Sequence, residues 1–395
     1  MPDNHTLTAT SLPRRARLRR TAEVAAAFLR IGATAFGGPA AHIAIMRHEL
    51  VERRKWLDEQ HFLDLLGATN LIPGPNSSEM AMHIGFVRAG FAGLIAGGLG
   101  FLLPAMVIVL GLAWAYLKYG ETPAAGWLLY GIKPVIIPLI VLAIWSLGKR
   151  AVKDALTALV GVAALVLYFA GINFVVLLLG GGLVVMLAHN AARLRKGHLV
   201  RAILPLPLIG PVLATSTVTA TGFSLWEMFL IFLKIGALLY GSGYVLFAYM
   251  QADLVTRHAW LTQRQLIDAI AVGQMTPGPL STSTTFVGYL LGGVPGALIA
   301  TGAFYLPSFI VVAISNPLIP RLRRSAWAGS FLDGVNVAAL GIMTAVTWQL
   351  ARAAFPDAFT LLVGLAAAGL LLRYRLNSVW LVAFGAALGL LHAVL

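Results

Sequence analysis

The amino-acid sequence predicts an all-α polytopic membrane protein, made of two homologous inverted-topology repeats with broken or re-entrant helices. Three observations favour this fold class. Hydrophobic residues make up 59% of the chain, charged residues make up 11%, and the mean hydropathy is +0.84. Apolar runs of about 20 residues, the length that spans a bilayer as a helix, recur along the chain. The second half repeats the first, and the charges of equivalent loops alternate out of phase.

The expected elements follow from changes in apolar and basic composition. Residues 1–21 are polar and rich in arginine, so we expect a cytoplasmic tail, and no small-residue cleavage site indicates a removable signal peptide. Basic residues lie in short loops, so membrane topology explains the net charge of +14 better than nucleic-acid binding does. The expected segments are 22–46, apolar and broken at Phe36-Gly37-Gly38-Pro39; 57–72, amphipathic; 77–117, broken near Gly97-Gly98 and Pro104; and 126–147, 155–170 and 173–189, all apolar.

An internal repeat restarts this pattern after a basic stretch at 190–201. With an offset of 204 residues, Pro73-Gly74-Pro75 falls on Pro277-Gly278-Pro279. The predicted division is a tail at 1–21, a first repeat at 22–201, a Pro- and Thr-rich linker at 202–222 and a second repeat at 223–395. Other matched positions, the last three after a one-residue deletion, are Trp56 with Trp260, Asp64 with Asp268, Pro104 with Pro307, Gly131 with Gly334 and Trp145 with Trp348.

Loop charge indicates that the two repeats are inverted rather than parallel. Lys and Arg concentrate in the short cytoplasmic loops of membrane proteins. The first repeat is basic at 47–55 and 149–153, whereas the equivalent loops of the second repeat carry little positive charge. The reverse holds at 321–324, whose equivalent in the first repeat has only Lys118. We therefore expect equivalent loops on opposite sides of the membrane, an arrangement known from transporters, which requires residues 190–222 to cross once.

The two Pro-Gly-Pro motifs are the predicted centre of the molecule. Proline and glycine interrupt a helix, and broken backbone in lipid is tolerated only inside protein or beside a water-filled cavity. Small polar residues follow each motif, so each is expected to begin a helix whose free N–H groups and positive end suit an anion. A simple proline kink is the alternative. The candidate anion-binding residues are Gly37, Gly38, Pro73, Gly74, Pro75, Asn76, Ser77, Gly241, Pro277, Gly278, Pro279 and Ser281.

Charged residues inside apolar segments are costly and are treated as functional candidates. Arg30 and Lys234 occupy equivalent positions just before the two glycine-rich breaks, and two such cations would suit a dianion. Alternatively, they pair with Glu23 and Glu227, seven residues earlier on the same helix face, or extend to the membrane interface. Lys133 is a third candidate cation, with an interfacial role as its alternative.

Further polar candidates lie next to the Pro-Gly-Pro motifs. Glu79 and His83, one helical turn apart, are candidates for proton coupling, with a cap carboxylate and a packed histidine as the alternative. Both groups are missing from the equivalent positions of the second repeat, so a proton role would be asymmetric. Asn70 and Gln274, one turn before each motif, are candidate neutral donors, and we expect His42 to be structural.

Other classes of function are less well supported by the sequence. The chain has no cysteine, which excludes disulfides and cysteine-based metal sites, and nothing resembles an ATP-binding loop. We expect no cofactor, no metal and no catalytic residue, so transport would draw on an ion gradient or the membrane potential. An intramembrane serine protease using Ser77 or Ser78 with His83 is an alternative, but an enzyme has no need of a twofold site. A channel is harder to separate from a transporter by sequence.

The motifs resemble those of a known family. Phe36-Gly37-Gly38-Pro39 with His42, a Pro-Gly-Pro motif after a Trp-Leu pair and an amphipathic helix, and the duplication are similar to the two-domain form of the chromate ion transporter family. The resemblance covers about residues 22–393. The second repeat departs from the glycine motif, with Tyr240-Gly241-Ser242-Gly243, which leaves open whether both repeats bind the ion equally.

The resemblance implies a secondary transporter that exports chromate across the bacterial inner membrane and confers chromate resistance. The arginine-rich tail predicts a cytoplasmic N-terminus. Sulfate is a near-isosteric tetrahedral dianion, so a transporter or channel for sulfate or another small inorganic anion is the alternative. The expected partners are the inorganic oxyanion and membrane lipids, without nucleic acid. Association as a homodimer is left open.

Overall fold

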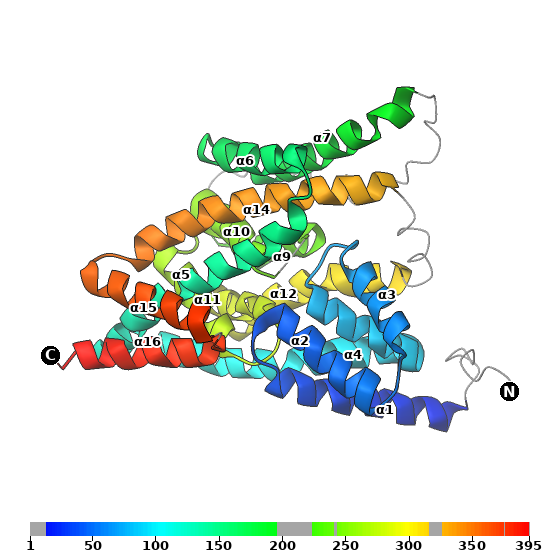
Figure 1. Ribbon diagram of the computed structural model, residues 1–395. Coiled ribbons are helices and arrows are strands. Elements are labelled where there is room, and N and C mark those ends of the chain that lie inside the picture. The colour runs from blue at the N-terminus through cyan, green and yellow to red at the C-terminus, as the bar shows by residue number, and fades with distance from the viewer. Residues whose placement is uncertain (1–12, 196–222, 241–242, 316–325, 375, 395) are drawn as a thin grey trace.

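The computed structural model describes residues 13–195, 223–240, 243–315, 326–374 and 376–394, which form helices and turns without a strand (Figure 1). The first repeat contains α1 (Arg14–Thr34), α2 (Gly38–Met46), the π-helical turn η2 (Arg47–Arg53), α3 (Glu59–Thr69), α4 (Asn76–Tyr119), α5 (Pro123–Ala151), α6 (Ala155–Phe169) and α7 (Phe174–Arg195). The second contains α9 (Leu225–Leu238), α10 (Val245–Met250), η4 (Gln251–Arg257), α11 (Gln263–Met275), η5 (Leu280–Thr282), α12 (Ser283–Ser315), α14 (Ala326–Ala354), α15 (Ala358–Tyr374) and α16 (Ser378–His392).

The two repeats match helix for helix, from α1 with α9 to α7 with α16. Five of the described helices, α4, α5, α7, α12 and α14, contain an apolar window long enough to cross a membrane. Helix α1 already begins at Arg14, so part of the predicted tail is helical. The predicted linker at 202–222 lies outside the described residues.

Helix α4 is a hairpin of two antiparallel legs. The chain reverses at Ala89 and Gly90, where Gly90 has φ +64° and ψ −149°, a conformation that glycine adopts readily. A Cβ on Gly85 would lie 2.1 Å from the carbonyl oxygen of Gly93, so the legs pack backbone against backbone. The first leg, Asn76–Arg88, is shorter than the roughly 20 residues that cross a bilayer, so it is re-entrant.

The break that the sequence predicts near Gly97-Gly98 and Pro104 was wrong, because α4 stays helical through these residues. Gly97 instead allows the second leg to approach the first: a Cβ there would lie 2.5 Å from the carbonyl oxygen of Ala81. The glycines at this position therefore serve helix packing, while Gly90 supplies the break.

Helix α12 repeats the same hairpin. Its chain reverses at Gly292 and Gly293, and Gly293 has φ 61° and ψ −151°. The hydroxyl groups of Thr285 and Thr301 hydrogen-bond across the two legs at 2.7 Å. Each Pro-Gly-Pro motif is thus followed by a short leg and a return leg, as the prediction of re-entrant helices requires.

Equivalent helices of the two repeats cross antiparallel. Lys153, just beyond the end of α5, lies 2.7 Å from Asp333 near the start of α14. Tyr130, near the start of α5, donates a hydrogen bond of 2.5 Å to Asp357, just beyond the end of α14. Antiparallel equivalents are what an inverted repeat produces, so the predicted fold class is confirmed.

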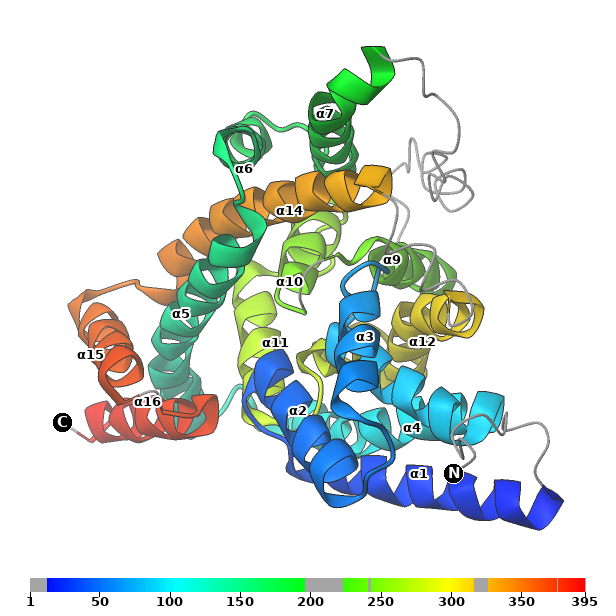
Figure 2. The same cartoon turned by 45° about the vertical axis from the view of Figure 1, so that its right-hand side comes forward.

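The outer helices are exchanged between the repeats. Helices α6 and α7 pack along α14 of the second repeat, and α15 and α16 pack along α5 of the first (Figures 1 and 2). Glycine permits both contacts: a Cβ on Gly131 would lie 2.1 Å from the carbonyl oxygen of Gly385, and one on Gly334 would lie 2.3 Å from that of Gly181. The repeats are therefore interlocked rather than side by side.

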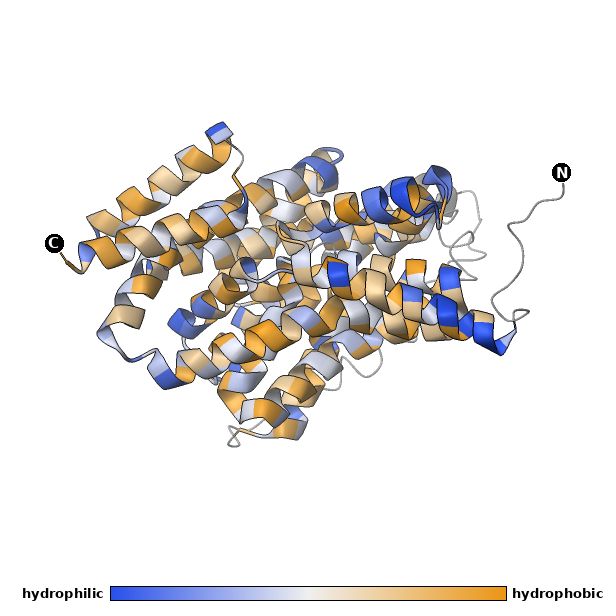
Figure 3. Cartoon of the chain, turned by 90° about the horizontal axis from the view of Figure 1, so that it is seen from below, coloured by the Kyte–Doolittle hydropathy of each residue, from blue (hydrophilic) through white to orange (hydrophobic). Residues whose placement is uncertain are grey.

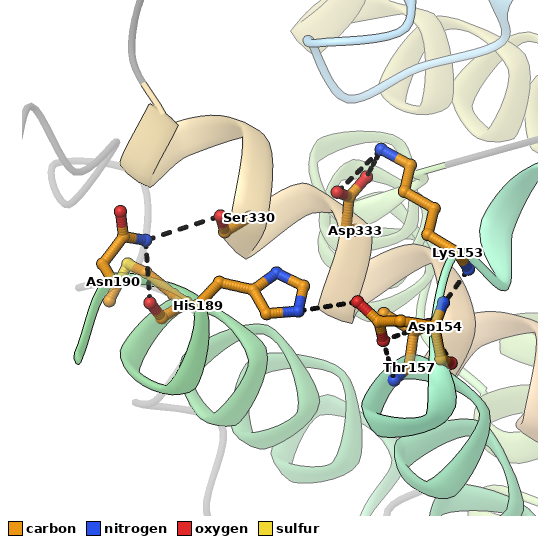
Figure 4. Close-up of polar contacts among 8 residues, drawn as sticks. Lys153, Asp154, Thr157, His189, Asn190, Ser330 and Asp333 are labelled. Carbon is orange, nitrogen blue, oxygen red and sulfur yellow. Dashed lines mark hydrogen bonds and ion pairs between the residues drawn. The ribbon is translucent and has the colours of Figure 1, made fainter. Parts of the chain in front are cut away.

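One end of the molecule brings together polar groups from both repeats (Figure 4). Nε2 of His189 in α7 lies 2.8 Å from the carboxylate of Asp154, which caps α6. Beside them lies the ion pair of Lys153 with Asp333 of α14. The start of α14 therefore lies beside the chain that joins α5 to α6, and the basic residues 321–324 themselves lie outside the described residues.

The surface of the helices suits contact with lipid. Trp145 and Trp348 occupy equivalent positions in α5 and α14 and are 64% and 63% exposed. Apolar residues run along most of the helices, and hydrophilic residues gather at helix ends and in loops (Figure 3). This distribution is typical of membrane-spanning helices.

Candidate anion site at the crossed Pro-Gly-Pro turns

Each Pro-Gly-Pro turn is hydrogen-bonded to the glycine-rich break of the other repeat. The N–H of Gly74 donates to the carbonyl oxygen of Leu239 at 2.6 Å, and the N–H of Gly278 donates to that of Ala35 at 2.8 Å. Ala35 and Leu239 are themselves equivalent positions, at the ends of α1 and α9. The four broken segments therefore meet around one pseudo-twofold centre.

Side chains of the opposite repeat also close over each turn. A Cβ on Gly74 would lie 2.4 Å from the hydroxyl oxygen of Ser308 in α12, and a Cβ on Gly278 would lie 2.8 Å from Cβ of Ala105 in α4. Ser308 and Ala105 are equivalent positions of the two repeats. Only the first turn is therefore covered by a polar side chain at this position.

A buried carboxyl group makes the first turn still more polar. A Cβ on Gly74 would lie 2.1 Å from Oε1 of Glu79, and Glu79 is fully buried. Neither carboxyl oxygen has a hydrogen bond of normal geometry among the described residues, although the Ser308 hydroxyl lies beside it. The second repeat has Ser283 in place of Glu79, so the asymmetry expected from the sequence is real.

The helices that begin at the turns leave their first N–H groups without intrahelical partners. The N–H of Ser78 donates to the carbonyl oxygen of Pro75 at 2.8 Å, and that of Thr282 donates to Pro279 at 3.0 Å. Of the N–H groups of residues 76–78 and 280–282, the last of each set is therefore already used. The two preceding N–H groups of each helix start keep the donor character of a helix N-terminus.

One tyrosine hydroxyl lies between the two helix starts. The Tyr305 hydroxyl of α12 is 2.5 Å from the hydroxyl oxygen of Ser281, and the Ser78 hydroxyl of the other repeat lies beside it. All three residues are buried, as are Ser77 and the prolines and glycines of both turns. The structure thus brings Pro73, Gly74, Pro75, Ser77, Pro277, Gly278, Pro279 and Ser281 together in the protein interior.

The remaining predicted backbone residues lie at the edge of this centre. Gly37 has φ +107° and begins α2, and Gly38 lies beside the Tyr244 hydroxyl, which accepts a 3.2 Å hydrogen bond from Gln274. Asn76 is partly exposed and donates to the side-chain oxygen of Asn70 at 2.7 Å, while the Asn70 amide donates to the carbonyl oxygen of Leu66 at 3.0 Å. Gly241 lies outside the described residues.

The structure places the two predicted cations differently. Arg30 is exposed on α1 and has no ion pair among the described residues. Lys234 is mostly covered, with a side chain 10% exposed, and its Nζ lies 2.7 Å from the carboxylate of Asp253 in η4. Neither cation pairs with the glutamate seven residues earlier on its helix: Glu23 binds Arg88 at 2.9 Å, and Glu227 lies 3.6 Å from His258.

Two other candidates have identifiable packing partners. His42 is buried, with its ring edge-on to Phe101 at a centroid distance of 5.4 Å, as a structural role predicts. Lys133 is buried in an ion pair with Asp268 at 3.1 Å, rather than at an interface. His83 is also buried on the first leg of α4.

Sequence reasoning missed several residues of the centre, chiefly Tyr305, Ser308 and Asp253. Tyr305 and Ser308 lie on either side of Pro307, and their first-repeat equivalents are the apolar residues Leu102 and Ala105. A polar residue in one repeat opposite an apolar one in the other was the signal that could have identified them. Asp253 falls in the predicted loop of the second repeat that is equivalent to residues 47–55, whereas the structure buries it, with 2% exposed. The crossed hydrogen bonds of Ala35 and Leu239 involve backbone alone, and no sequence signal marks them.

Two interlocked repeats with re-entrant hairpins, whose broken ends meet inside the protein, define an inverted-repeat membrane transporter. A profile of the family described as Chromate transporter matches residues 22–186 and again residues 226–390.

Relatives of similar length carry consistent names. A probable chromate transport protein of Synechococcus elongatus is 33% identical over 86% of this chain and 87% of its own length. Chromate transport proteins of Cupriavidus metallidurans and Pseudomonas aeruginosa are 32% and 31% identical, over 91% and 88% of this chain and 90% and 86% of their own lengths. No solved structure matches the chain. The chain belongs to the chromate transporter family.

Proposed function

We propose that this protein is a secondary transporter that exports chromate across the bacterial inner membrane, and that the crossed Pro-Gly-Pro turns hold the ion. The observation that carries the proposal is the burial of two helix N-termini, one from each repeat, around a single pseudo-twofold centre. Backbone N–H groups at such ends bind oxyanions without needing a matching number of charged side chains. The N–H groups of residues 76, 77, 280 and 281, with the hydroxyls of Ser77 and Ser281, would be the donors.

Entry of the ion requires the turns to separate, because their residues are buried. One backbone hydrogen bond joins each turn to the opposite repeat, at Gly74 with Leu239 and at Gly278 with Ala35. The two bonds are related by the pseudo-twofold axis. Opening one while the other remains closed would therefore expose the centre to one side of the membrane only, which is what alternating access requires.

The predicted cations keep a place in this proposal with different roles. Lys234 can attract the dianion only by giving up Asp253, so its contribution would come when the centre opens. Arg30 is exposed on α1 and is available to an ion that approaches the break after Thr34. The N-terminus would be cytoplasmic, in keeping with the basic residues near it.

Glu79 and His83 are the candidates for proton coupling. The carboxyl group of Glu79 sits against Gly74, inside the proposed site, where its charge and a bound dianion would repel each other. Uptake of a proton by Glu79 would favour binding of the ion, and release would favour its departure. Replacing Glu79 by Gln should make transport independent of a proton gradient.

The test is uptake into everted membrane vesicles, whose interior corresponds to the outside of the cell. Vesicles that contain the protein should accumulate chromate, driven by their inside-positive membrane potential. Because Glu79 would carry a proton together with the ion, collapse of the inside-acid pH gradient alone should raise the rate. Vesicles with Gly74→Val, at equal protein level, are the control and should show no uptake.

Competing sulfate decides between the two substrates. Sulfate that inhibits chromate uptake at equal concentration, and is itself accumulated, would make the protein a broader tetrahedral-oxyanion transporter. Flux that follows the membrane potential alone, with no response to a pH gradient, would indicate a channel. Uptake by right-side-out vesicles only would contradict export.

A further inference from the structure

A second buried cluster borders a cavity that lies outside the crossed turns. Nζ of Lys133 in α5 is 3.1 Å from Oδ1 of Asp268 in α11, and the Tyr116 hydroxyl of α4 donates to Oδ2 at 2.9 Å. The side chains of Lys133 and Asp268 are 9% and 1% exposed. Tyr116 and Asp268 also line a cavity of about 770 Å³, together with Arg264.

The ion pair is not explained by stability alone. Taking a Lys and an Asp out of water costs about as much as their attraction returns, and an apolar pair of the same size is often as stable. The first-repeat equivalent of Asp268 is Asp64, and the position equivalent to Lys133 is Asn336, so the buried cation occurs in one copy only. A buried ion pair that is present in only one of the two repeats and borders a cavity suggests a role in binding.

The cavity offers donors for an anion. Arg264 contributes an exposed guanidinium and Tyr116 contributes a hydroxyl. Lys133 is outside the lining and reaches it only through its ion pair with Asp268. The other titratable groups of the lining are Glu121, Tyr130 and His392. A tetrahedral oxyanion is far smaller than the cavity, so it would enter with part of its water shell.

We propose that this cavity is a second anion subsite, in which a small tetrahedral oxyanion displaces the carboxylate of Asp268 from Lys133 and takes Arg264 and the Tyr116 hydroxyl as further donors. Asp268 is then an internal counter-ion that keeps Lys133 paired while the subsite is empty. The inference rests on the proposed function, because the transported ion is the occupant. Helix α11 runs directly from Asp268 to the second Pro-Gly-Pro turn, so occupancy of the cavity can reach the centre through one helix.

The test is a chromate titration of the purified protein in detergent, followed by tryptophan fluorescence. Trp127 lines the cavity, and chromate absorbs near-ultraviolet light that tryptophan emits, so a bound ion should quench it. Replacing Trp127 by Phe identifies the part of the signal that comes from the cavity. Inorganic sulfate, which does not absorb there, should reverse the quenching by competition.

The variants separate the counter-ion from the donors. Asp268→Asn should bind chromate roughly tenfold more tightly, because a unit negative charge no longer competes with the dianion for Lys133. The double variant Lys133→Gln with Asp268→Asn leaves no buried unpaired charge, so it should fold, and it should bind at least about tenfold more weakly than Asp268→Asn. Lys118→Gln is the matched control, because Lys118 is a nearby cation outside the cavity lining.

Unchanged chromate affinity in both Asp268→Asn and the double variant would overturn the inference. Trp127 fluorescence that changes when phosphatidylglycerol is added, but not when chromate or sulfate is added, would also overturn it and would assign the cavity to a lipid phosphate. The experiment distinguishes failure of this inference from failure of the proposed function. Gly74→Val should abolish transport and leave the quenching of Trp127 unchanged. A chain that transports no chromate but still shows sulfate-reversible quenching would retain the subsite and lose the transport proposal.

Discussion

At the scale of single residues, Gly74 and Gly278 are the positions that tolerate least change. Their φ values of +145° and +86° belong to backbone that residues with a side chain rarely adopt. Each also lies against the opposite repeat, with no room for a Cβ. The backbone conformation and the close packing each independently require glycine at these positions.

We expect Gly74→Ala and Gly278→Ala to impair transport and Gly74→Val to abolish it. Overpacking costs about 1–3 kcal/mol, in addition to the backbone strain. Gly171→Ala is the control, because Gly171 has φ +83° with nothing within 4 Å of an added Cβ. The measurements are chromate uptake per folded protein and the thermal midpoint in detergent.

Ser77→Ala should cost only about 1 kcal/mol of binding, as for one neutral hydrogen bond.

A folded Gly74→Val protein with unchanged chromate affinity would rule out a backbone cradle. If the motif were only a kink, the two turns would respond to substitution like Gly171.

Lys234→Gln should destabilise the protein by about 3–5 kcal/mol, because it leaves the buried carboxylate of Asp253 unpaired. Adding Asp253→Asn should restore folding, and transport by this double variant then isolates the role of the charge.

Arg30→Gln should lower transport without changing the thermal midpoint, since Arg30 is exposed. Arg30→Lys should also lower it if the guanidinium grips two oxygens. Normal transport by Arg30→Gln combined with Lys234→Gln and Asp253→Asn would remove both cations from the site.

At the scale of helices, glycine contacts decide how the repeats interlock. Gly131 of α5 meets Gly385 of α16, and the equivalent Gly334 of α14 meets Gly181 of α7. Both contacts bring helix backbones together, which small residues permit in membranes, where burial of apolar surface gives little drive for helix association. The exchange of outer helices between the repeats depends on these contacts.

Gly131→Leu and Gly334→Leu should each weaken the packing of one exchanged pair and lower the thermal midpoint. Gly126→Leu in α5 and Gly329→Leu in α14 are the matched controls, because nothing lies within 4 Å of a Cβ at either position. Thermal unfolding in detergent measures the difference. Equal loss of stability in a variant and its control on the same helix would contradict the packing role.

At the scale of the whole molecule, the pseudo-twofold relation places equivalent loops on opposite faces. The antiparallel crossing of α5 and α14 and the crossed hydrogen bonds of the turns both express this relation. The chain has no cysteine, so introduced thiols report on single positions without background.

Single cysteines at Arg54, just after η2, and at Arg257, the last residue of η4, should react with a membrane-impermeant reagent from opposite sides of the membrane. Position 54 should be labelled from the cytoplasmic side, because its loop is the basic one. Labelling of both positions from the same side would reject the inverted arrangement in the membrane.

The sequence by itself determined the class of the protein, the duplication, the positions of both Pro-Gly-Pro turns and the inverted relation. These properties follow from the composition, from matched residues of rare types such as Trp56 and Trp260, and from the charge of the loops. None of these features depends on knowing which residues are in contact. Burial of the candidate turns also follows, because lipid does not tolerate exposed broken backbone.

Only the tertiary structure decided which groups meet. The bonds from Gly74 to Leu239 and from Gly278 to Ala35 join backbone atoms, so no side-chain type marks them in the sequence. The partner of Lys234 proved to be Asp253, 19 residues away, because a hairpin rather than a helix face sets their distance. The fold of α4 likewise depended on which glycine took a positive φ, since Gly90 and Gly97 differ in their neighbours rather than in their chemistry.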